Sequence, residues 1–295
     1  MDAMAIKQIR RFNRTVAEGI GALDTRFLGR ARPMAEARVL WEIGTAGADL
    51  HELRDRLGLD PAGLARILRS LGRQRLVRVV AGDRRARRAV LTRAGLSERA
   101  ELDRRSDAVA LRMLDPLSDH QRQAFVAAAA EVERLLRASM VRFAIEDPTS
   151  ADSRWCVAQY FAELQARFET GFDPARSIPA DAPELTPPHG ALFIARLRGQ
   201  PVGCGAVKLH GTAPAELKRM WIAPSARSLG LGRRLLRALE QHAREAGAAM
   251  VRLETNRALT EAIALYRRSG YVEVPAFNSE PYAHHWFEKR CTACA

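Results

Sequence analysis

The stretch WIAPSARSLGLGRRLLRALE, residues 221–240, joins a run of β-forming residues to an amphipathic helix through a turn of small residues. Gly230 and Gly232 stand one residue apart in this turn, and Arg227 and Arg233 flank them. Glycine lets the backbone approach a ligand closely, and the free N–H groups at the start of a helix favour an anion. The spacing matches neither the Walker A nor the Rossmann fingerprint. The turn is nevertheless predicted to bind a pyrophosphate, because it shares with those motifs a close backbone approach at glycine and free N–H groups at a helix start.

Short apolar runs surround this turn, which is typical of strands. They alternate with helices that the pattern predicts near residues 159–170, 229–246 and 260–269. A polar connector, EDPTSADS, precedes them at residues 146–153. With 295 residues, 47% of them hydrophobic, the chain is long enough for two domains. We therefore expect a mixed α/β domain over residues 150–295 and a separate, mostly helical domain over residues 1–145.

The second domain resembles the GNAT family of acetyltransferases over about residues 150–290. The resemblance rests on Arg-x-x-Gly-x-Gly, from Arg227 to Gly232, and on RLETNRALTEAIALYRRSGYVEV, residues 252–274. It implies acetyl-CoA as co-substrate, no metal, and direct attack of an amine on the thioester. The implied cofactor-binding residues are Met220, Trp221, Ile222, Arg227, Ser228, Leu229, Gly230, Leu231, Gly232 and Arg233.

Two positions depart from the family pattern. Leu229 stands where an arginine usually precedes the glycine, and Leu259 stands where an asparagine often contacts the cofactor. Asn256 is the residue that could compensate for the second change, and we include it among the cofactor-binding candidates.

The resemblance also suggests catalytic residues. Tyr266 matches the general acid of the family, because a phenol with a pKa near 10 stays protonated at neutral pH. Glu254 is the first candidate for the base and Glu216 is its rival, while a water acting without a single base is a third possibility. Either glutamate could instead form a salt bridge, for instance with Lys218 or Arg252.

The segment PAFNSEPYAHHWFEK, residues 275–289, follows the Gly-Tyr strand, where GNAT proteins commonly complete the acceptor pocket. Tyr282 and His284 are the pocket candidates. The alternative is a final strand whose Trp286 packs inward while the histidines lie on its surface. Adjacent histidines cannot share one face of a strand, so a metal site is not expected there.

The first domain contains a helix with two different faces. Asp60-Pro61 is a strong helix start, and an apolar stripe at Leu64, Ile67, Leu68 and Leu71 follows it. Residues 75–95 then form two β-prone runs around a Gly-Asp turn. Candidate DNA-binding residues on the other face of the helix and in the hairpin are Arg66, Arg69, Ser70, Arg73, Arg84, Arg85, Arg87 and Arg88. This pattern predicts a winged helix-turn-helix.

This half resembles the MarR family of transcription regulators over about residues 5–143. The resemblance rests on LGLDPAGLARILRSLGRQRLV, residues 57–77, and DRRARRAVLTRAG, residues 83–95. It implies double-stranded DNA as a partner and a homodimer formed through the first and last helices. The last of these helices opens with Ser118 and Gln121 in capping-box spacing.

Charge and cysteine content agree with these interpretations. The net charge is +13, and residues 1–145 hold 28 basic against 18 acidic residues, so the excess lies in the first half. The four cysteines are too few and too scattered for a disulfide framework, and Cys291-x-x-Cys294 is interpreted as a tail. No signal peptide or membrane span is indicated, so a cytoplasmic protein is expected.

Two functions from different classes follow. The first is a bifunctional helix-turn-helix regulator and N-acetyltransferase acting on a small amine or an amino-acid-like substrate. The second is a transcription factor whose GNAT domain senses an acyl-CoA or an amine without turnover. Tyr266 together with a glutamate on a strand favours the enzyme.

Overall fold

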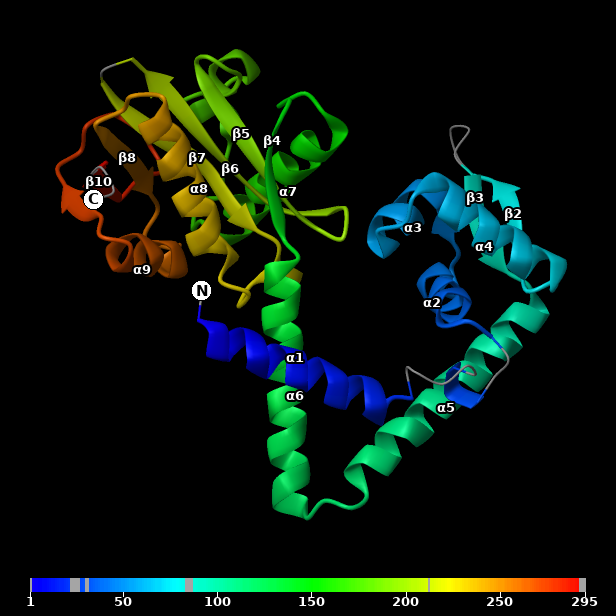
Figure 1. Ribbon diagram of the computed structural model, residues 1–295. Helices are drawn as coiled ribbons and strands as arrows, with labels where there is room; N and C mark the ends of the chain where they lie inside the picture. Colours follow the sequence, from blue (N-terminus) through cyan, green and yellow to red (C-terminus); the bar gives the residue numbers. More distant parts are fainter. Residues whose placement is uncertain (1, 22–26, 30–31, 83–86, 212, 292–295) are drawn as a thin grey trace. The chain divides into compact units, whose positions relative to one another are not determined.

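The computed structural model describes residues 2–21, 27–29, 32–82, 87–211 and 213–291 (Figure 1). The chain divides into two compact units, Met1–Glu131 and Val132–Ala295. Among the described residues, no helix is both long enough and apolar enough to cross a membrane.

The first unit is mostly helical and contains a small sheet. Its elements in chain order are α1 (Ala3–Gly19), η1 (Phe27–Gly29), α2 (Met34–Ile43), β1 (Ala48–Asp49), α3 (Leu50–Leu57), α4 (Pro61–Arg73), β2 (Val77–Ala81), β3 (Arg87–Leu91), α5 (Arg93–Leu114) and the larger part of α6 (Asp119–Ser139). The antiparallel sheet has the order β1-β3-β2. Buried residues of α2, α3, α4 and this sheet share one core, which includes Leu40, Leu53, Leu68 and Ala89.

Helix boundaries in this unit follow the predicted caps. The Asp49 side chain accepts hydrogen bonds from the backbone at the start of α3, and Asp60 accepts one from Gly63 N at the start of α4. Ser118 and Gln121 form the reciprocal bonds of a capping box. The predicted stripe of α4 is buried throughout. The succession of two short helices and a hairpin in this unit thus follows from local signals.

The first helix contributes no residue to the core of this unit. α1 ends at Gly19, and Phe27 begins the separate turn η1. No residue of α1 is buried, although the helix carries an apolar stripe.

The second unit is a mixed α/β fold. Its elements are β4 (Arg142–Glu146), α7 (Ala151–Arg167), η3 (Pro174–Arg176), η4 (Ala182–Leu185), β5 (Gly190–Leu197), β6 (Gln200–His210), β7 (Ala213–Ile222), η5 (Pro224–Ala226), α8 (Leu231–Glu245), β8 (Met250–Thr255), α9 (Thr260–Arg268), β9 (Val272–Val274) and β10 (His285–Arg290). Within the described residues they form a seven-stranded sheet of order β4-β5-β6-β7-β8-β10-β9. β7 and β8 pair in parallel, and the other pairs are antiparallel.

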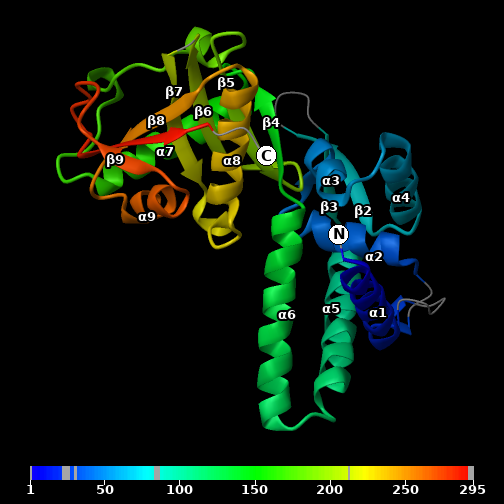
Figure 2. The ribbon, with the colours of Figure 1, turned by 60° about the vertical axis from the view of Figure 1, so that its left-hand side comes forward.

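Both faces of this sheet are covered by helices, and Figure 2 shows the sheet from a second direction. Ala191 and Phe193 of β5 belong to a core with α8 and α9 residues, whereas Leu192 and Ile194 belong to a core with Cys156 of α7. Because side chains alternate along a strand, this division assigns α8 and α9 to one face and α7 to the other.

The structure moves the start of the second unit towards the N-terminus. Residues 142–146 were expected to belong to the first domain and the connector, yet they form β4, which pairs with β5 from Arg142–Arg196 to Glu146–Leu192. The connector is therefore shorter than expected. Ser150 caps α7, whose first residue, Ala151, lies eight residues before the predicted helix start. A short edge strand with one apolar face carries little periodicity, which explains why the pattern missed it.

Candidate active site

The site forms where two strands of the large sheet separate. β7 and β8 pair only at Ala215–Val251 and Glu216–Arg252, although β7 continues to Ile222. A β-bulge also interrupts β7 where it pairs with β6, since two residues, Arg219 and Met220, oppose Gly205. Arg219 takes a positive φ of 55° at this bulge. The strand thereby turns away from its parallel neighbour and leaves a gap in the sheet.

One cavity, of about 590 Å³, runs along the predicted pyrophosphate turn. Its lining includes most of the predicted cofactor-binding residues, namely Met220, Trp221, Ile222, Arg227, Ser228, Gly230, Leu231, Gly232 and Arg233. We call it the cofactor groove. Gly230 is the N-cap of α8 and has a φ of 70°, a left-handed conformation that glycine adopts readily. The first N–H groups of α8 follow it and have no partner within the helix.

Two predicted cofactor residues lie elsewhere. Leu229 is 6% exposed and packs in the core on the α7 face, because an apolar side chain replaces the usual arginine at this position. Asn256 lines the neighbouring pocket, where its amide donates to Tyr282 O at 2.7 Å and accepts from Ala258 N at 2.9 Å. The Asn256 amide therefore holds its own loop, and the structure does not support it as a cofactor contact.

Positive charge at the groove is partly engaged by an acidic residue of α7. Glu163 pairs with Arg227 and also accepts a hydrogen bond from Trp221 Nε1 at 2.9 Å. Arg227 Nε further donates to Ile222 O at 3.0 Å. These contacts fix the Arg227 side chain at the mouth of the turn.

The end of α6 supports the same turn from outside. Arg134 Nη1 donates to Ser228 O at 2.7 Å. Arg234 of α8 donates to Ala138 O and, at 2.9 Å, to Val141 O. Ser228 has a φ of 66°, a conformation that a non-glycine residue adopts only when its surroundings support it.

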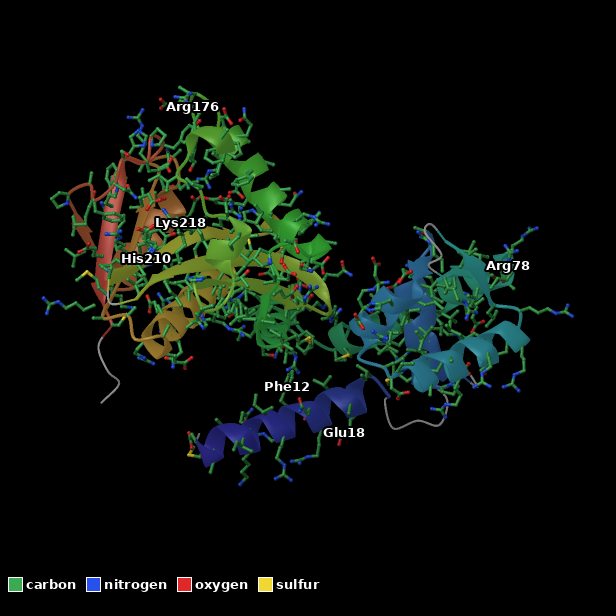
Figure 3. The ribbon with its side chains drawn as sticks, turned by 90° about the horizontal axis from the view of Figure 1, so that it is seen from above. Phe12, Glu18, Arg78, Arg176, His210 and Lys218 are labelled. Carbon is green, nitrogen blue, oxygen red and sulfur yellow. The ribbon has the colours of Figure 1, made fainter. Side chains whose placement is uncertain are left out.

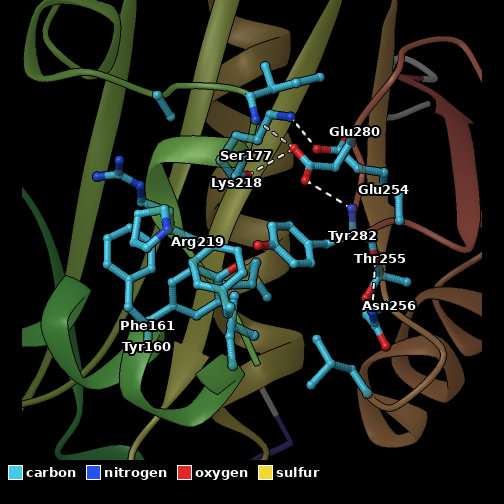
Figure 4. Close-up of a pocket in the computed structure, with 18 of the residues that line it drawn as sticks. Tyr160, Phe161, Ser177, Lys218, Arg219, Glu254, Thr255, Asn256, Glu280 and Tyr282 are labelled. Atoms are coloured by element: carbon cyan, nitrogen blue, oxygen red, sulfur yellow. Dashed lines mark hydrogen bonds and ion pairs between the residues drawn. The ribbon is translucent and has the colours of Figure 1, made fainter. Parts of the chain in front are cut away.

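A second cavity, of about 250 Å³, lies on the other side of the strand gap. We call it the acceptor pocket. Its walls come from α7, the segment 172–181, the bulge of β7, the end of β8 and the loop 280–283. Glu254 and Glu280 lie on one side of the pocket, and Arg219, Phe161 and Tyr160 lie on the other (Figure 4).

The two cavities meet at Tyr266. Tyr266 lines both, as do Tyr160 and Met220. The Tyr266 ring packs against Tyr271 and Phe287, with centroid distances of 5.8 and 5.9 Å. Burial raises the pKa of Tyr266, and the Glu254 carboxylate raises it further. The phenol is therefore held in its protonated form between the groove and the pocket.

The two candidate bases occupy different environments. Glu254 lines the acceptor pocket and pairs with Lys218. Glu216 does not line it. Its carboxylate contacts Arg252 at 2.5 Å, Lys218 at 3.5 Å and His210 at 3.9 Å. Burial opposes ionisation of Glu216, but Arg252, Lys218 and His210 together keep its pKa below the usual value.

Both salt bridges that were considered as alternatives are therefore formed, Glu254 with Lys218 and Glu216 with Arg252. Glu216 belongs to the sheet rather than to the pocket, and the structure does not support it as a base. Glu254 combines an ion pair with a position on the pocket wall.

The acceptor-pocket candidates divide in the same way. Tyr282 lines the pocket, and its hydroxyl accepts a hydrogen bond from Asp173 N at 3.0 Å. His284 does not line it and is exposed, while its backbone N–H donates to Thr255 O at 2.9 Å. His285 contacts Glu273 Oε1 at 2.6 Å. Only His285 lies in β10, and His284 is exposed just before it. The alternative is corrected in one respect, because Phe287 is the buried residue of this strand and Trp286 is half-buried.

Several pocket residues were not predicted. Glu280 is 8% exposed and accepts hydrogen bonds from Ile178 N at 2.7 Å, Ser177 Oγ at 2.9 Å and Tyr282 N at 3.3 Å, so it ties two pocket loops together. The other additions are aromatic or basic: Tyr160, Phe161, Phe168, Phe172 and Arg219. The aromatic residues of α7 and the segment after it were a visible signal in the sequence, but nothing local related them to β7.

The candidate DNA-binding residues differ in exposure. Arg66, Arg69 and Arg73 of α4 and Arg87 of β3 are exposed. Ser70 is half-buried, and its hydroxyl donates to Glu36 at 2.7 Å, so it faces α2. Arg88 donates to Ala46 O at 3.1 Å and Gly47 O at 3.3 Å, which connects β3 to the turn before β1. Ser70 and Arg88 therefore have structural roles.

Three predicted residues lie outside the described ranges, Arg84 and Arg85 of the hairpin turn and Cys294 of the tail. Cys156, Cys204 and Cys291 are free thiols. Within the described ranges, no group of three or more His, Cys, Asp or Glu side chains is placed to hold a metal ion.

Comparison with known proteins identifies the second unit. The model of the acetyltransferase (GNAT) family matches residues 158–271. IAA acetyltransferase of Azospirillum brasilense is 39% identical over 103 residues, which make up 35% of this chain and 66% of that protein. N-alpha-acetyltransferase RimI of Mycobacterium tuberculosis is 34% identical over 129 residues, or 43% of this chain and 76% of that protein.

Among solved structures, a Klebsiella pneumoniae protein provisionally described as an acyl-CoA N-acyltransferase is 30% identical. The match covers 52% of this chain and 99% of that protein, with a TM-score of 0.43. The chain spans just under two thirds of the length of the IAA acetyltransferase that it matches.

Proposed function

Because the chain belongs to the acetyltransferase (GNAT) family, we propose that its C-terminal unit transfers the acetyl group of acetyl-CoA to the amine of a small acceptor. The observation that carries the proposal is the meeting of the cofactor groove and the acceptor pocket at Tyr266. A thioester arriving from one side and an amine from the other would face each other there.

The cofactor groove would bind the pyrophosphate of acetyl-CoA through the backbone N–H groups at the start of α8, with Arg227 and Arg233 supplying positive charge. The pantetheine arm would follow Met220 to Ile222. β7 makes no strand pair with β8 beyond Glu216, so backbone N–H groups on that edge are available to stabilise the developing oxyanion.

The chemistry needs one proton acceptor and one proton donor. The amine nitrogen attacks the thioester carbonyl, a C–N bond forms, and the C–S bond breaks. Glu254, directly or through a water, takes a proton from the ammonium before the attack, and Tyr266 gives its proton to the departing thiolate. The second N–H proton leaves the nitrogen after the C–N bond forms and passes to solvent. The net products are an N-acetylated acceptor, free CoA thiol and one proton, with the phenol reprotonated from solvent.

The test is thiol release by the purified full chain with acetyl-CoA and a panel of amines. An acetyltransferase of known activity serves as the positive control. Release that depends on the amine supports the enzyme. Calorimetric binding of acetyl-CoA without release for any amine would instead favour the sensor.

A second function concerns the first unit, and we propose that it binds double-stranded DNA as a MarR-like winged helix-turn-helix. The supporting observation is the arrangement of α3, α4 and the β2–β3 hairpin, with Arg66, Arg69 and Arg73 exposed on α4. Replacing Arg66 and Arg69 with alanine should weaken binding to all duplexes and reduce its salt dependence, as measured by titration at several salt concentrations. Wild-type binding that does not respond to salt would contradict the proposal.

We also propose that two copies associate through the first unit. α1 buries no residue, and its apolar side chains Met4, Ile9 and Phe12 are 78%, 59% and 39% exposed. Figure 3 shows Phe12 projecting from the helix. A second copy would remove this apolar stripe from water. Ile9→Arg should shift a dimer to a monomer in sedimentation, whereas a monomeric wild-type chain would rule the dimer out.

A further inference from the structure

The acceptor pocket contains a cation on its aromatic side. Arg219 stands at the bulge of β7, and its guanidinium carbon lies 5.4 Å from the ring centroid of Phe161. Both residues line the acceptor pocket, across from Glu254 and Glu280 (Figure 4). The bulge matters because its positive φ sets the direction in which the Arg219 side chain leaves the strand.

Of the two basic residues among those that line the acceptor pocket, Lys218 has an acidic partner and Arg219 does not. Arg227 pairs with Glu163, Lys218 with Glu254 and Arg252 with Glu216. Within the described ranges, no carboxylate lies at ion-pair distance from Arg219, and its guanidinium makes no hydrogen bond. Burial lowers the pKa of Arg219, and Tyr160, Cys204, Asp181 and Glu184 offset this only in part.

A guanidinium keeps its charge in proteins, so Arg219 is a partly buried cation whose hydrogen-bonding capacity is unused. Such a group is costly unless a partner arrives. Of the acidic residues that line the pocket, Glu254 is paired with Lys218, Glu280 is satisfied by loop donors, and Asp181 lies beyond ion-pair distance of Arg219. A ligand carboxylate would match the planar fork of Arg219.

The wall beside Arg219 is aromatic. Phe161 and Phe172 lie 5.4 Å apart, Phe168 and Phe172 5.8 Å, and Phe172 and Tyr282 4.9 Å, all as centroid distances. These rings line the pocket and leave an apolar surface between the Arg219 side and the loop 280–283. An apolar or aromatic group of the acceptor would bury its surface there.

We propose that the acceptor is a free α-amino acid with an apolar or aromatic side chain, and that Arg219 binds its carboxylate. Its amine faces Glu254 and Tyr266, and its side chain packs on the aromatic wall. This inference rests on the acetyl transfer proposed above and narrows its substrate class. An amine without a carboxylate would leave Arg219 unpaired when the pocket closes around it.

The experiment uses three acceptors that share one ring and one primary amine: phenylalanine, phenylalanine amide and phenethylamine. Thiol release from acetyl-CoA gives kcat/KM for each. We expect the free acid to exceed the amide about 10- to 100-fold, the range that a hydrogen bond between charged groups supplies. In Arg219→Gln this ratio should fall towards one, and Arg219→Lys should keep part of it, since lysine retains the charge without the fork.

Arg176→Gln is the matched control. The Arg176 guanidinium also lies over a pocket ring, 5.9 Å from the centroid of Tyr282, but its side chain is exposed and does not line the pocket. Its variant should retain the wild-type ratio. Circular dichroism melting and calorimetric affinity for acetyl-CoA test whether each variant is folded.

The outcomes separate this inference from the proposal on which it rests. The amino-acid assignment fails, and acetyl transfer stands, if kcat/KM of the wild-type chain is the same for the amide and the free acid. The same conclusion follows if other amines release thiol while all three probes are inert. If no amine releases thiol, both fail together. A ratio unchanged in Arg219→Gln would exclude Arg219 as the carboxylate site.

Discussion

The cofactor groove and the acceptor pocket adjoin at Tyr266, but they are built in different ways. Half of the residues that line the groove come from one stretch, Met220 to Arg233, whose chemistry lies mainly in backbone N–H groups at a helix start. The pocket draws on α7, α9, two loops and two strands, and its chemistry lies in side chains. A site made by local backbone geometry tolerates changes in side chains, whereas a site made by distant side chains changes its ligand with each of them.

The largest effect is expected where the two cavities meet. Tyr266→Phe removes one oxygen, keeps the ring packed against Tyr271 and Phe287, and should lower kcat about 10²- to 10⁴-fold, the usual contribution of a general acid. KM for acetyl-CoA should change little, because the phenol acts on the leaving sulfur. Steady-state kinetics measure both values.

The raised pKa of Tyr266 adds a condition on pH. The phenol keeps its proton at least up to the usual phenol pKa of about 10, so deprotonation of Tyr266 should cause no loss of kcat up to that pH. This assignment would be contradicted if kcat of the wild-type chain decreased above about pH 8 and this decrease were absent in Tyr266→Phe.

The cofactor groove should lose affinity for acetyl-CoA when a charge is placed at the glycine turn. Gly232→Asp introduces a negative charge beside the expected pyrophosphate, and we expect acetyl-CoA affinity to fall about 100-fold by calorimetry. Gly232→Ala is the control, since its Cβ would meet Leu265 Cδ2 at 3.3 Å and carries no charge. Equal losses in both variants would mean that packing, and not charge, determines the effect.

These two regions also explain what the sequence could and could not predict. The turn at Gly230 and the cap at Asp60 act within one helical turn, so their roles follow from neighbouring residues. Arg219 depends on a bulge, and a bulge arises from the register between β6 and β7. No local pattern reports that register. The same limit applies to Asn256, whose partner Tyr282 comes from a distant loop.

The acceptor pocket should also respond to the loss of its carboxylate. If Glu254 takes the ammonium proton, Glu254→Gln should lower kcat/KM for the amine about 100-fold near neutral pH, the lower end of the usual contribution of a general base. The loss should shrink as pH rises, because free amine becomes plentiful and needs no base. Rates measured across pH test this. A loss that is the same at every pH would assign Glu254 to the structural pair with Lys218.

Glu216→Gln is the counterpart of that variant and should have the smallest effect on turnover. Glu216 pairs with Arg252 outside the pocket, so kcat should stay near the wild-type value while the free energy of unfolding falls by about 1–3 kcal/mol at neutral pH. Denaturant titration measures this stability, and thiol release measures kcat.

The pH dependence gives this last variant a second readout. The pKa of Glu216 is lowered in the folded chain, so its ionised carboxylate stabilises the fold above the unfolded pKa of about 4.3. That stability is lost as pH falls through the folded pKa, and the difference between Glu216→Gln and the wild-type chain should narrow there. A large loss of kcat in this variant, with stability unchanged, would return Glu216 to the list of bases and remove the distinction between sheet and pocket.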